Sequence, residues 1–203
     1  MKRSGFTLLE LLLVMAILII VIAIVAPAAS TIIRGNRVSQ AAQTVVDQMG
    51  LARQLALTRN HNVEMRFYRF ADPEAPTSAS SFRALQIFDM VSAAAAVPAG
   101  KMQMLPPRII ADSSANLSSL FDPGKRSVRA GVDPLPRVGT NYQYAVIRFR
   151  PDGSTDLLPT AGSWFLTLHD EATGDALSQP PANFVTVEVD PANGVVQLFR
   201  PGV

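Results

Sequence analysis

Two histidines are the side chains best suited to acid–base chemistry at neutral pH. His61 falls between an amphipathic stretch and an alternating one, where a turn or cap role is expected. His169 precedes Asp170, and a Ser-His-Asp arrangement can be written with Ser163. Sequence neighbours rarely form such a triad, however, and no serine here has nucleophile-elbow glycines around it. We therefore predict no catalytic residues and expect that the protein is not an enzyme.

A short group of oxygen-bearing side chains could in principle hold a cation. Its members are Asp170, Glu171, Thr173 and Asp175. Oxygen ligands suit calcium, but this spacing does not match an EF-hand loop, and a solvated hairpin is expected instead. The chain has no cysteine, which excludes disulfides and thiolate metal sites, and it has no P-loop or dinucleotide glycine pattern. We predict no metal site and no cofactor, and the sequence leaves calcium at Asp170–Asp175 open.

The chain has one local cluster of basic residues, in a Gly- and Pro-rich stretch expected to be an exposed loop. Its members are Lys125, Arg126, Arg129 and Arg137. The formal net charge is only +2, and Lys2 and Arg3 alone supply that excess. Proteins that coat nucleic acid carry a basic face, which this balance does not provide. We expect Trp164 and Tyr142 to pack in a sheet rather than stack on bases, and expect no nucleic-acid partner.

The most unusual carboxylate is Glu10, because it stands inside an apolar run. Every other residue of 6–26 except Thr7 is apolar. A helix of this length spans about 31 Å, the thickness of a hydrocarbon core. A carboxylate at the centre of a membrane helix costs about 2.5–3.5 kcal/mol, so it needs a partner or a place near the headgroups.

The competing interpretation of the apolar run is a cleaved secretory signal. Ala26–Ser30 offers small residues at which such a signal could be cut. A signal has an apolar region of only about 7–15 residues, so we predict a retained membrane helix. Basic residues lie on both sides of it, including Arg34 and Arg37 beyond it, so charge alone leaves the orientation open.

The helix is expected to continue past the apolar run as an amphipathic segment over residues 30–60. Pro27 predicts a kink or boundary between the two parts. Apolar residues then recur at intervals of three and four, as on one face of a helix. They are Val38, Ala42, Val45, Met49, Ala52 and Ala56. Asn60-His61-Asn62 is a plausible end of the helix.

Residues 61–203 are predicted to form a β-rich domain on which the amphipathic face packs. Alternating or short apolar stretches between Gly- and Pro-containing turns predict strands joined as an antiparallel meander. These stretches are 63–67, 82–91, 108–111, 142–150, 164–169, 184–189 and 195–199. Residues 92–140 are expected to be a loop-rich insert. The predicted fold is therefore α+β, with a long N-terminal helix packed on an antiparallel sheet.

The N-terminal residues Lys2-Arg3-Ser4-Gly5-Phe6-Thr7-Leu8-Leu9-Glu10 resemble the processing site of type IV prepilins and type II secretion pseudopilins. The resemblance covers about residues 1–30. It implies that 1–5 is a leader, cut between Gly5 and Phe6 by a prepilin peptidase that also methylates the amine of Phe6. It implies that 6–29 is a transmembrane and polymerisation helix, and that Pro27 is its kink.

The resemblance also assigns a partner to Glu10. The carboxylate would pair with the amine of Phe6 on a neighbouring subunit and set the axial register. The chain would begin as a single-pass protein of the inner membrane, with its leader cytoplasmic and its β-domain periplasmic. It would then enter a periplasmic or surface filament through its helix.

Weaker similarities concern the rest of the chain. Residues 51–67, 149–154 and 185–196 are similar to the helix-to-strand passage and hairpins of GspH/FimT-type minor pseudopilins. The long insert departs from that pattern, and pilin-like proteins of the Verru_Chthon cassette type are also candidates. The expected function is that of a minor pilin or pseudopilin. The alternative is a minor pilin that binds DNA during uptake, with Arg126 and Arg129 as its test positions.

Overall fold

The structure is a computed structural model that describes residues 7–92 and 95–200, without the side chains of 24–34. The chain divides into two compact units, Met1–Asn36 and Arg37–Val203. One long helix, α1 (Leu8–Arg59), contributes to both units. All strands belong to the second unit, so the predicted α+β class is confirmed.

Helix α1 ends where the sequence predicts. Asn60, the next residue, has φ 53°, a left-handed conformation that asparagine adopts readily after a helix. The predicted apolar stripe is confirmed as well, because all six of its members, from Val38 to Ala56, are buried. Small residues such as Ala42 and Ala52 in this stripe let the helix backbone lie close to the sheet.

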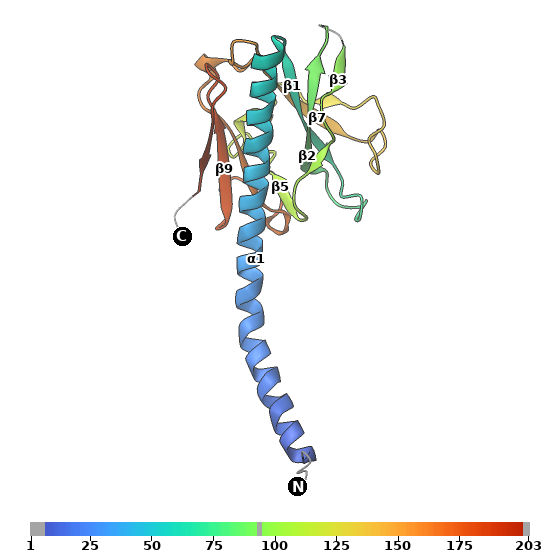
Figure 1. Ribbon diagram of the computed structural model, residues 1–203, viewed down its shortest axis with the longest axis vertical. Coiled ribbons are helices and arrows are strands. Elements are labelled where there is room, and N and C mark those ends of the chain that lie inside the picture. The colour runs from blue at the N-terminus through green and yellow to red at the C-terminus, as the bar shows by residue number, and fades with distance from the viewer. Residues whose placement is uncertain (1–6, 93–94, 201–203) are drawn as a thin grey trace. The chain divides into compact units, whose positions relative to one another are not determined.

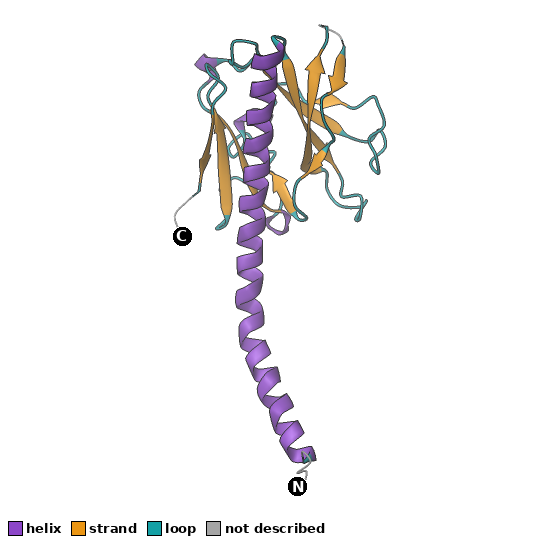
Figure 2. Ribbon diagram, viewed as in Figure 1, coloured by secondary structure: helices purple, strands orange, loops and turns teal. Residues whose placement is uncertain are grey.

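Within the described residues, ten strands form one sheet, whose arrangement is shown in Figures 1 and 2. They are β1 (Val63–Phe70), β2 (Ser81–Met90), β3 (Ala96–Pro98), β4 (Gln103–Met104), β5 (Ile109–Ala111), β6 (Arg129–Ala130), β7 (Gln143–Phe149), β8 (Trp164–Asp170), β9 (Phe184–Val189) and β10 (Val196–Phe199). Short 3-10 helices occur at η1 (Ser119–Phe121), η2 (Pro159–Ala161) and η3 (Glu171–Thr173). Every pairing between the strands is antiparallel.

The strand order corrects the predicted meander. The order is β10-β9-β8-β5-β2-β1-β7-β6, with β3 and β4 paired to β2. The last three strands do form a meander, but β7 and β8, which follow one another in sequence, are not neighbours. β7 instead pairs with β1, and β8 pairs with β5. The long segment between β7 and β8 allows this crossing, which local alternation does not reveal.

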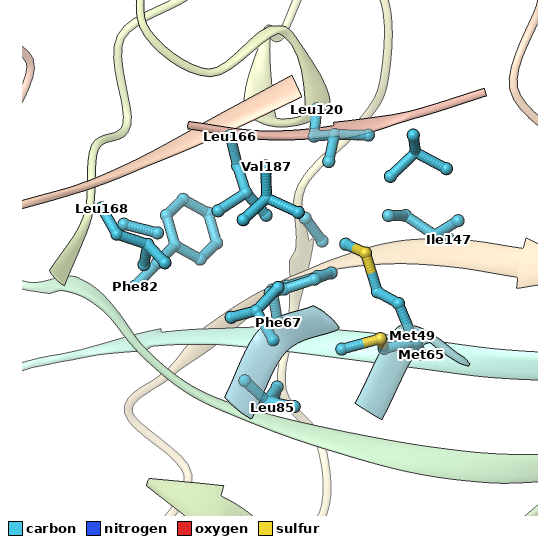
Figure 3. Close-up of a cluster of buried hydrophobic side chains, with 14 of the residues drawn as sticks. Met49, Met65, Phe67, Phe82, Leu85, Leu120, Ile147, Leu166, Leu168 and Val187 are labelled. Carbon is cyan, nitrogen blue, oxygen red and sulfur yellow. The ribbon is translucent and has the colours of Figure 1, made fainter. Parts of the chain in front are cut away.

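The amphipathic half of α1 lies against one face of this sheet, between β9 and β1 in Figure 1. Met49 from the helix meets side chains from both halves of the sheet in one buried cluster (Figure 3). Phe82 and Phe121 stack with ring centroids 3.9 Å apart within it. Burying a large apolar side chain contributes about 1.5–3 kcal/mol, so this cluster is the main source of stability.

Part of the insert covers the opposite face of the sheet, while Leu120 and Phe121 of the insert belong to the first cluster. Strands β3 and β4 extend it beyond β2, and β6 extends it beyond β7. A second apolar cluster forms there around Tyr68, Phe70 and Tyr142, with insert residues packed on it. The segment predicted to be loop-rich therefore adds short strands to the sheet and contributes to both apolar clusters.

Candidate functional site

The first described residues of α1 form a capping box. The amide and hydroxyl of Thr7 donate to Glu10 Oε2 at 2.9 and 2.8 Å, and the amide of Glu10 donates to Thr7 Oγ1 at 3.2 Å. This reciprocal pair satisfies backbone donors that a helix start otherwise leaves free. This cap was not among the predictions from the sequence, although Thr-x-x-Glu before an apolar run is a known signature of the motif.

The side chains that follow present apolar surface on all sides of the helix. Every described large apolar residue from Leu8 to Ile22 is exposed, with fractions of 81% at Leu8 and 63% at Ile22. A soluble monomer rarely exposes a contiguous apolar surface of this kind. Lipid or other protein chains must therefore cover this helical surface, which we call the bare segment (Leu8–Ile22).

Three expected site residues fall where the structure describes little or nothing. Gly5 and Phe6 lie outside the described residues, and of Pro27 only the place within α1 is described. Cleavage, methylation and the kink therefore stay predictions. No helix within residues 7–92 and 95–200 is both long enough and apolar enough to cross a membrane.

His169 has a buried partner that the sequence did not indicate. Its Nε2 lies 3.0 Å from Asp112 Oδ2, and both side chains are fully buried. Its Nδ1 lies 3.0 Å from the hydroxyl of Thr173. The triad written with Ser163 and Asp170 is absent, since Ser163 precedes β8 and His169 stands near the opposite end of that strand. Through His169, these contacts connect Thr173 of η3 with Asp112, the residue that follows β5. The His169 side chain is not accessible to solvent.

The carboxylate of Asp112 takes part in several hydrogen bonds of this network. Its Oδ1 accepts from the amide of Ser114 at 2.8 Å, and its Oδ2 also accepts from the amide of Leu177 at 3.1 Å. Burial acts to raise the pKa of the Asp112 carboxyl, but these hydrogen bonds outweigh it, so the pKa lies below its ordinary value. Asp112 is therefore a buried carboxylate held charged by its donors.

The oxygen-bearing group after His169 is used within the fold. Asp170 accepts from the amide of Ala172 and caps η3, and Asp175 accepts from the amide of Ser113 at 2.8 Å. Glu171 forms a bidentate ion pair with Arg83, one bond of which is 2.9 Å. The hydrogen bond from Arg83 lowers the pKa of Glu171 against its partial burial. Among the described residues, no group of three or more His, Asp or Glu side chains is placed to hold a metal.

The other histidine, His61, stands just after α1, with Nδ1 3.2 Å from the carbonyl of Asn62. It thus lies at the predicted helix-to-strand junction, and it borders a shallow hollow with Arg148. Nothing among the described contacts gives it a proton-transfer partner.

The structure separates the basic cluster seen in the sequence. Lys125 and Arg126 lie in a turn in which both amides donate to the carbonyl of Asp122. Arg126 also binds the carbonyl of Val146 at 2.7 Å and Asp156 at 2.8 Å. Arg137 borders a different hollow.

Arg148 of β7, by contrast, lines the same hollow as Lys125, Arg126 and Arg129. The pairing of β6 with β7 brings this segment to the strand that carries Arg148, and spacing along the chain does not indicate it. Trp164 and Tyr142 are buried, as expected, and are not free to stack on bases. These two rings are therefore part of the packed β-domain.

The N-terminal residues match a known protein family. Residues 1–26 match the family model of the prokaryotic N-terminal methylation motif. No curated protein is significantly similar to the chain.

Two solved structures have a related arrangement of elements. The type IV minor pilin FimU of Pseudomonas aeruginosa is 11% identical with a TM-score of 0.48, over 81% of this chain and 89% of that one. The minor pseudopilin EpsH of the type 2 secretion system of Vibrio cholerae is 12% identical with a TM-score of 0.45, over 82% of this chain and 99% of that one.

The family match covers every residue on which the prepilin-type resemblance was based, from Lys2 to Glu10. The resemblance is thereby confirmed. The chain carries the prokaryotic N-terminal methylation motif.

Proposed function

We propose that the protein is a minor pilin or pseudopilin, a structural subunit of a type IV pilus or type II secretion filament. One observation carries the proposal: the bare segment lies within the methylation motif of residues 1–26. A helical segment whose described large apolar side chains are all exposed suits a subunit that moves from lipid into a bundle of like helices.

The proposed route begins in the inner membrane. The apolar run 6–26 spans the bilayer once, with Lys2 and Arg3 on the cytoplasmic side and the β-domain in the periplasm. A prepilin peptidase cuts between Gly5 and Phe6 and methylates the new amine of Phe6. The subunit then joins other pilin-like subunits through its helix, and Pro27 supplies a bend within it.

The geometry at Glu10 fits a second bond across subunits. Both hydrogen bonds from Thr7 go to Oε2, and within the described residues no hydrogen bond reaches Oε1. The free oxygen can accept from the amine of Phe6 on a neighbouring subunit while Thr7 holds the carboxylate in place. In a surround of low polarity such a charge pair is far stronger than in water, so it can set the register.

Helix-to-helix contact is tested by disulfide cross-linking. The chain has no cysteine, so single cysteines can be introduced without background. Leu12→Cys, at an exposed position of the bare segment, is expected to cross-link neighbouring processed subunits in the filament fraction. The control is Val132→Cys, which is 84% exposed but lies in the β-domain, and which should cross-link far less. Equal cross-linking of the two variants would contradict assembly through the helix.

A further inference from the structure

The β-domain has a hollow whose free charges are all positive. It measures about 250 Å³ and is bordered by Lys125, Arg126, Ser127, Arg129 and Arg148, with Asp156 and Trp164 also in its lining. We call this the basic hollow. The proposed filament role does not use it, because it lies far along the chain from the bare segment and belongs to the second unit.

Two of its four cations are already neutralised. Arg126 binds Asp156 at 2.8 Å, and Arg148 binds the buried Glu64 at 3.1 Å. These two arginines are part of the fold, and Asp156 is fully used, because it also accepts from the amide of Arg148. No carboxylate in the hollow is left over.

The other two cations, Lys125 and Arg129, have no such partner. Both are exposed, and no ion pair joins either of them to a carboxylate in the described part of the chain. Lys125 is nevertheless held in place, since its ammonium donates to the carbonyl of Ala161 at 2.9 Å and lies 5.4 Å from the ring of Trp164. Ser127 also lines the hollow. The arrangement is preorganised to receive one anionic group.

The shape and composition of the hollow select among anions. A nucleic acid needs a row of cations along several phosphates, and single strands also need exposed aromatic faces. The hollow offers two free cations, and its aromatic ring, Trp164, is 1% exposed with its indole N–H already donating to Leu158. A side chain that ends in a carboxylate matches both the small volume and the paired donors.

We propose that the basic hollow is a docking site for an aspartate or glutamate side chain in an acidic segment of a partner protein. Lys125 and Arg129 bind the carboxylate, and Arg126 and Arg148 form the fixed positive wall behind it. The site does not depend on processing at Gly5. A negative result for the docking site would therefore leave the filament assignment unaffected, and the reverse also holds.

Trp164 makes the test specific, because it is the only tryptophan in the chain and its ring lies beneath Lys125 and Arg126. The full-length protein in detergent is titrated with N-acetylated hexaglutamate while Trp164 emission is followed. We expect a saturable change that weakens as salt is raised, and no change with hexaglutamine.

Three arginine variants distinguish binding in the hollow from a general effect of surface charge. Arg129→Gln is expected to weaken hexaglutamate binding about fivefold, and Arg129→Lys to retain most of it. Arg137→Gln removes an equally exposed charge from outside the hollow and should leave the affinity unchanged.

Four results would overturn the proposal. The first is the absence of any change of emission with hexaglutamate, and the second is an equal loss of affinity in Arg129→Gln and Arg137→Gln. The third is tighter binding of a thymidine hexanucleotide, which would indicate a phosphodiester ligand. The fourth is inorganic phosphate binding as tightly as the peptide, which would indicate a site for free anions.

Discussion

Thr7 and Glu10 hold each other at the first turn of α1, through two hydrogen bonds to the carboxylate and one in return. The same carboxylate is the one expected to pair with the amine of the neighbouring subunit. Glu10 thus has two roles that can be separated by substitution: it caps its own helix, and it carries the charge.

Glu10→Gln and Glu10→Ala are expected to impair incorporation into filaments to a similar degree. Glutamine at this position still forms a capping box, so Glu10→Gln removes the charge but preserves the helix start. Thr7→Ala removes the hydroxyl of the cap but keeps the charge of Glu10 and the backbone amide that donates to Oε2, so it should incorporate well. The measurement compares each variant in the membrane and filament fractions, with processing followed by gel mobility. Wild-type incorporation of Glu10→Gln would show that the charge is not needed.

Gly194→Ala is expected to destabilise the β-domain by about 1–3 kcal/mol. Gly194 has φ 66°, and a Cβ there would lie 2.5 Å from the carbonyl oxygen of Gly153. This turn also holds the carbonyl of Asn193, to which Arg53 of α1 donates at 2.7 Å. Thermal unfolding of the full chain measures the effect.

Gly139→Ala is the matched control for that substitution. Gly139 has φ 74°, but a Cβ there meets nothing within 4 Å. Alanine at position 139 therefore has the backbone strain but no steric clash. Gly139→Ala should lower the free energy of unfolding by less than Gly194→Ala does. If the two variants unfold at the same temperature, the close approach of the two turns is not what Gly194 is needed for.

Glu64→Ala is expected to destabilise the domain by about 1–3 kcal/mol. Glu64 is 1% exposed and faces Arg148 across the β1–β7 pair, while Arg66 donates to it at 2.6 Å. Its removal leaves two partly buried guanidinium groups without their shared anion, although both keep some access to water. Chemical denaturation measures the loss, and Glu74→Ala, at an exposed position, should lie within about 0.5 kcal/mol of wild type. Equal stability of the two variants would contradict a structural role for the buried carboxylate.

Asp112 and Glu171 are expected to make the domain acid-sensitive. Both have a pKa below the ordinary value in the folded state. The folded state therefore binds these protons less readily than the unfolded chain, and the stabilisation is complete above the unfolded pKa of about 4. It is lost as the pH falls further, through the folded values.

Unfolding temperatures between about pH 7 and about pH 2 test this dependence. Asp112→Asn should be less stable than wild type near neutrality and should lose less stability on acidification. Glu171 is expected to contribute to the remaining loss in that variant, which should therefore shrink further when Glu171→Gln is added. An Asp112→Asn variant that loses as much stability as wild type would show that Asp112 does not contribute.

The helix and most strands were predictable from the sequence because their signals are local. The stripe from Val38 to Ala56 has the period of a helix face, and Asn60 supplies the residue type that ends one. Alternation over residues 63–67 and 184–189 located β1 and β9 for the same reason. The order of the strands was not predictable, since β7 pairs with β1 across a long stretch of chain.

The same distinction applies to the candidate sites. The N-terminal motif is contiguous, so the sequence contains all of it. The basic cluster was predicted from nearness in sequence. In the folded chain, Arg137 borders a different hollow, and Arg148 lines the hollow of Lys125, Arg126 and Arg129. Likewise, Asp112 stands far from His169 along the chain, and only the pairing of β5 with β8 brings them together.

N-terminal sequencing of the protein, isolated from cells that contain a prepilin peptidase, is the most direct test of prepilin-type processing, because it identifies the cleavage site itself. The expected first residue is Phe6 with a methylated amine, and Gly5→Ala should instead keep its original N-terminus while Ser4→Ala is processed normally. A wild-type chain that still begins at Met1 in such cells, or a Gly5→Ala chain cut like wild type, would contradict processing at this motif and the filament role that depends on it.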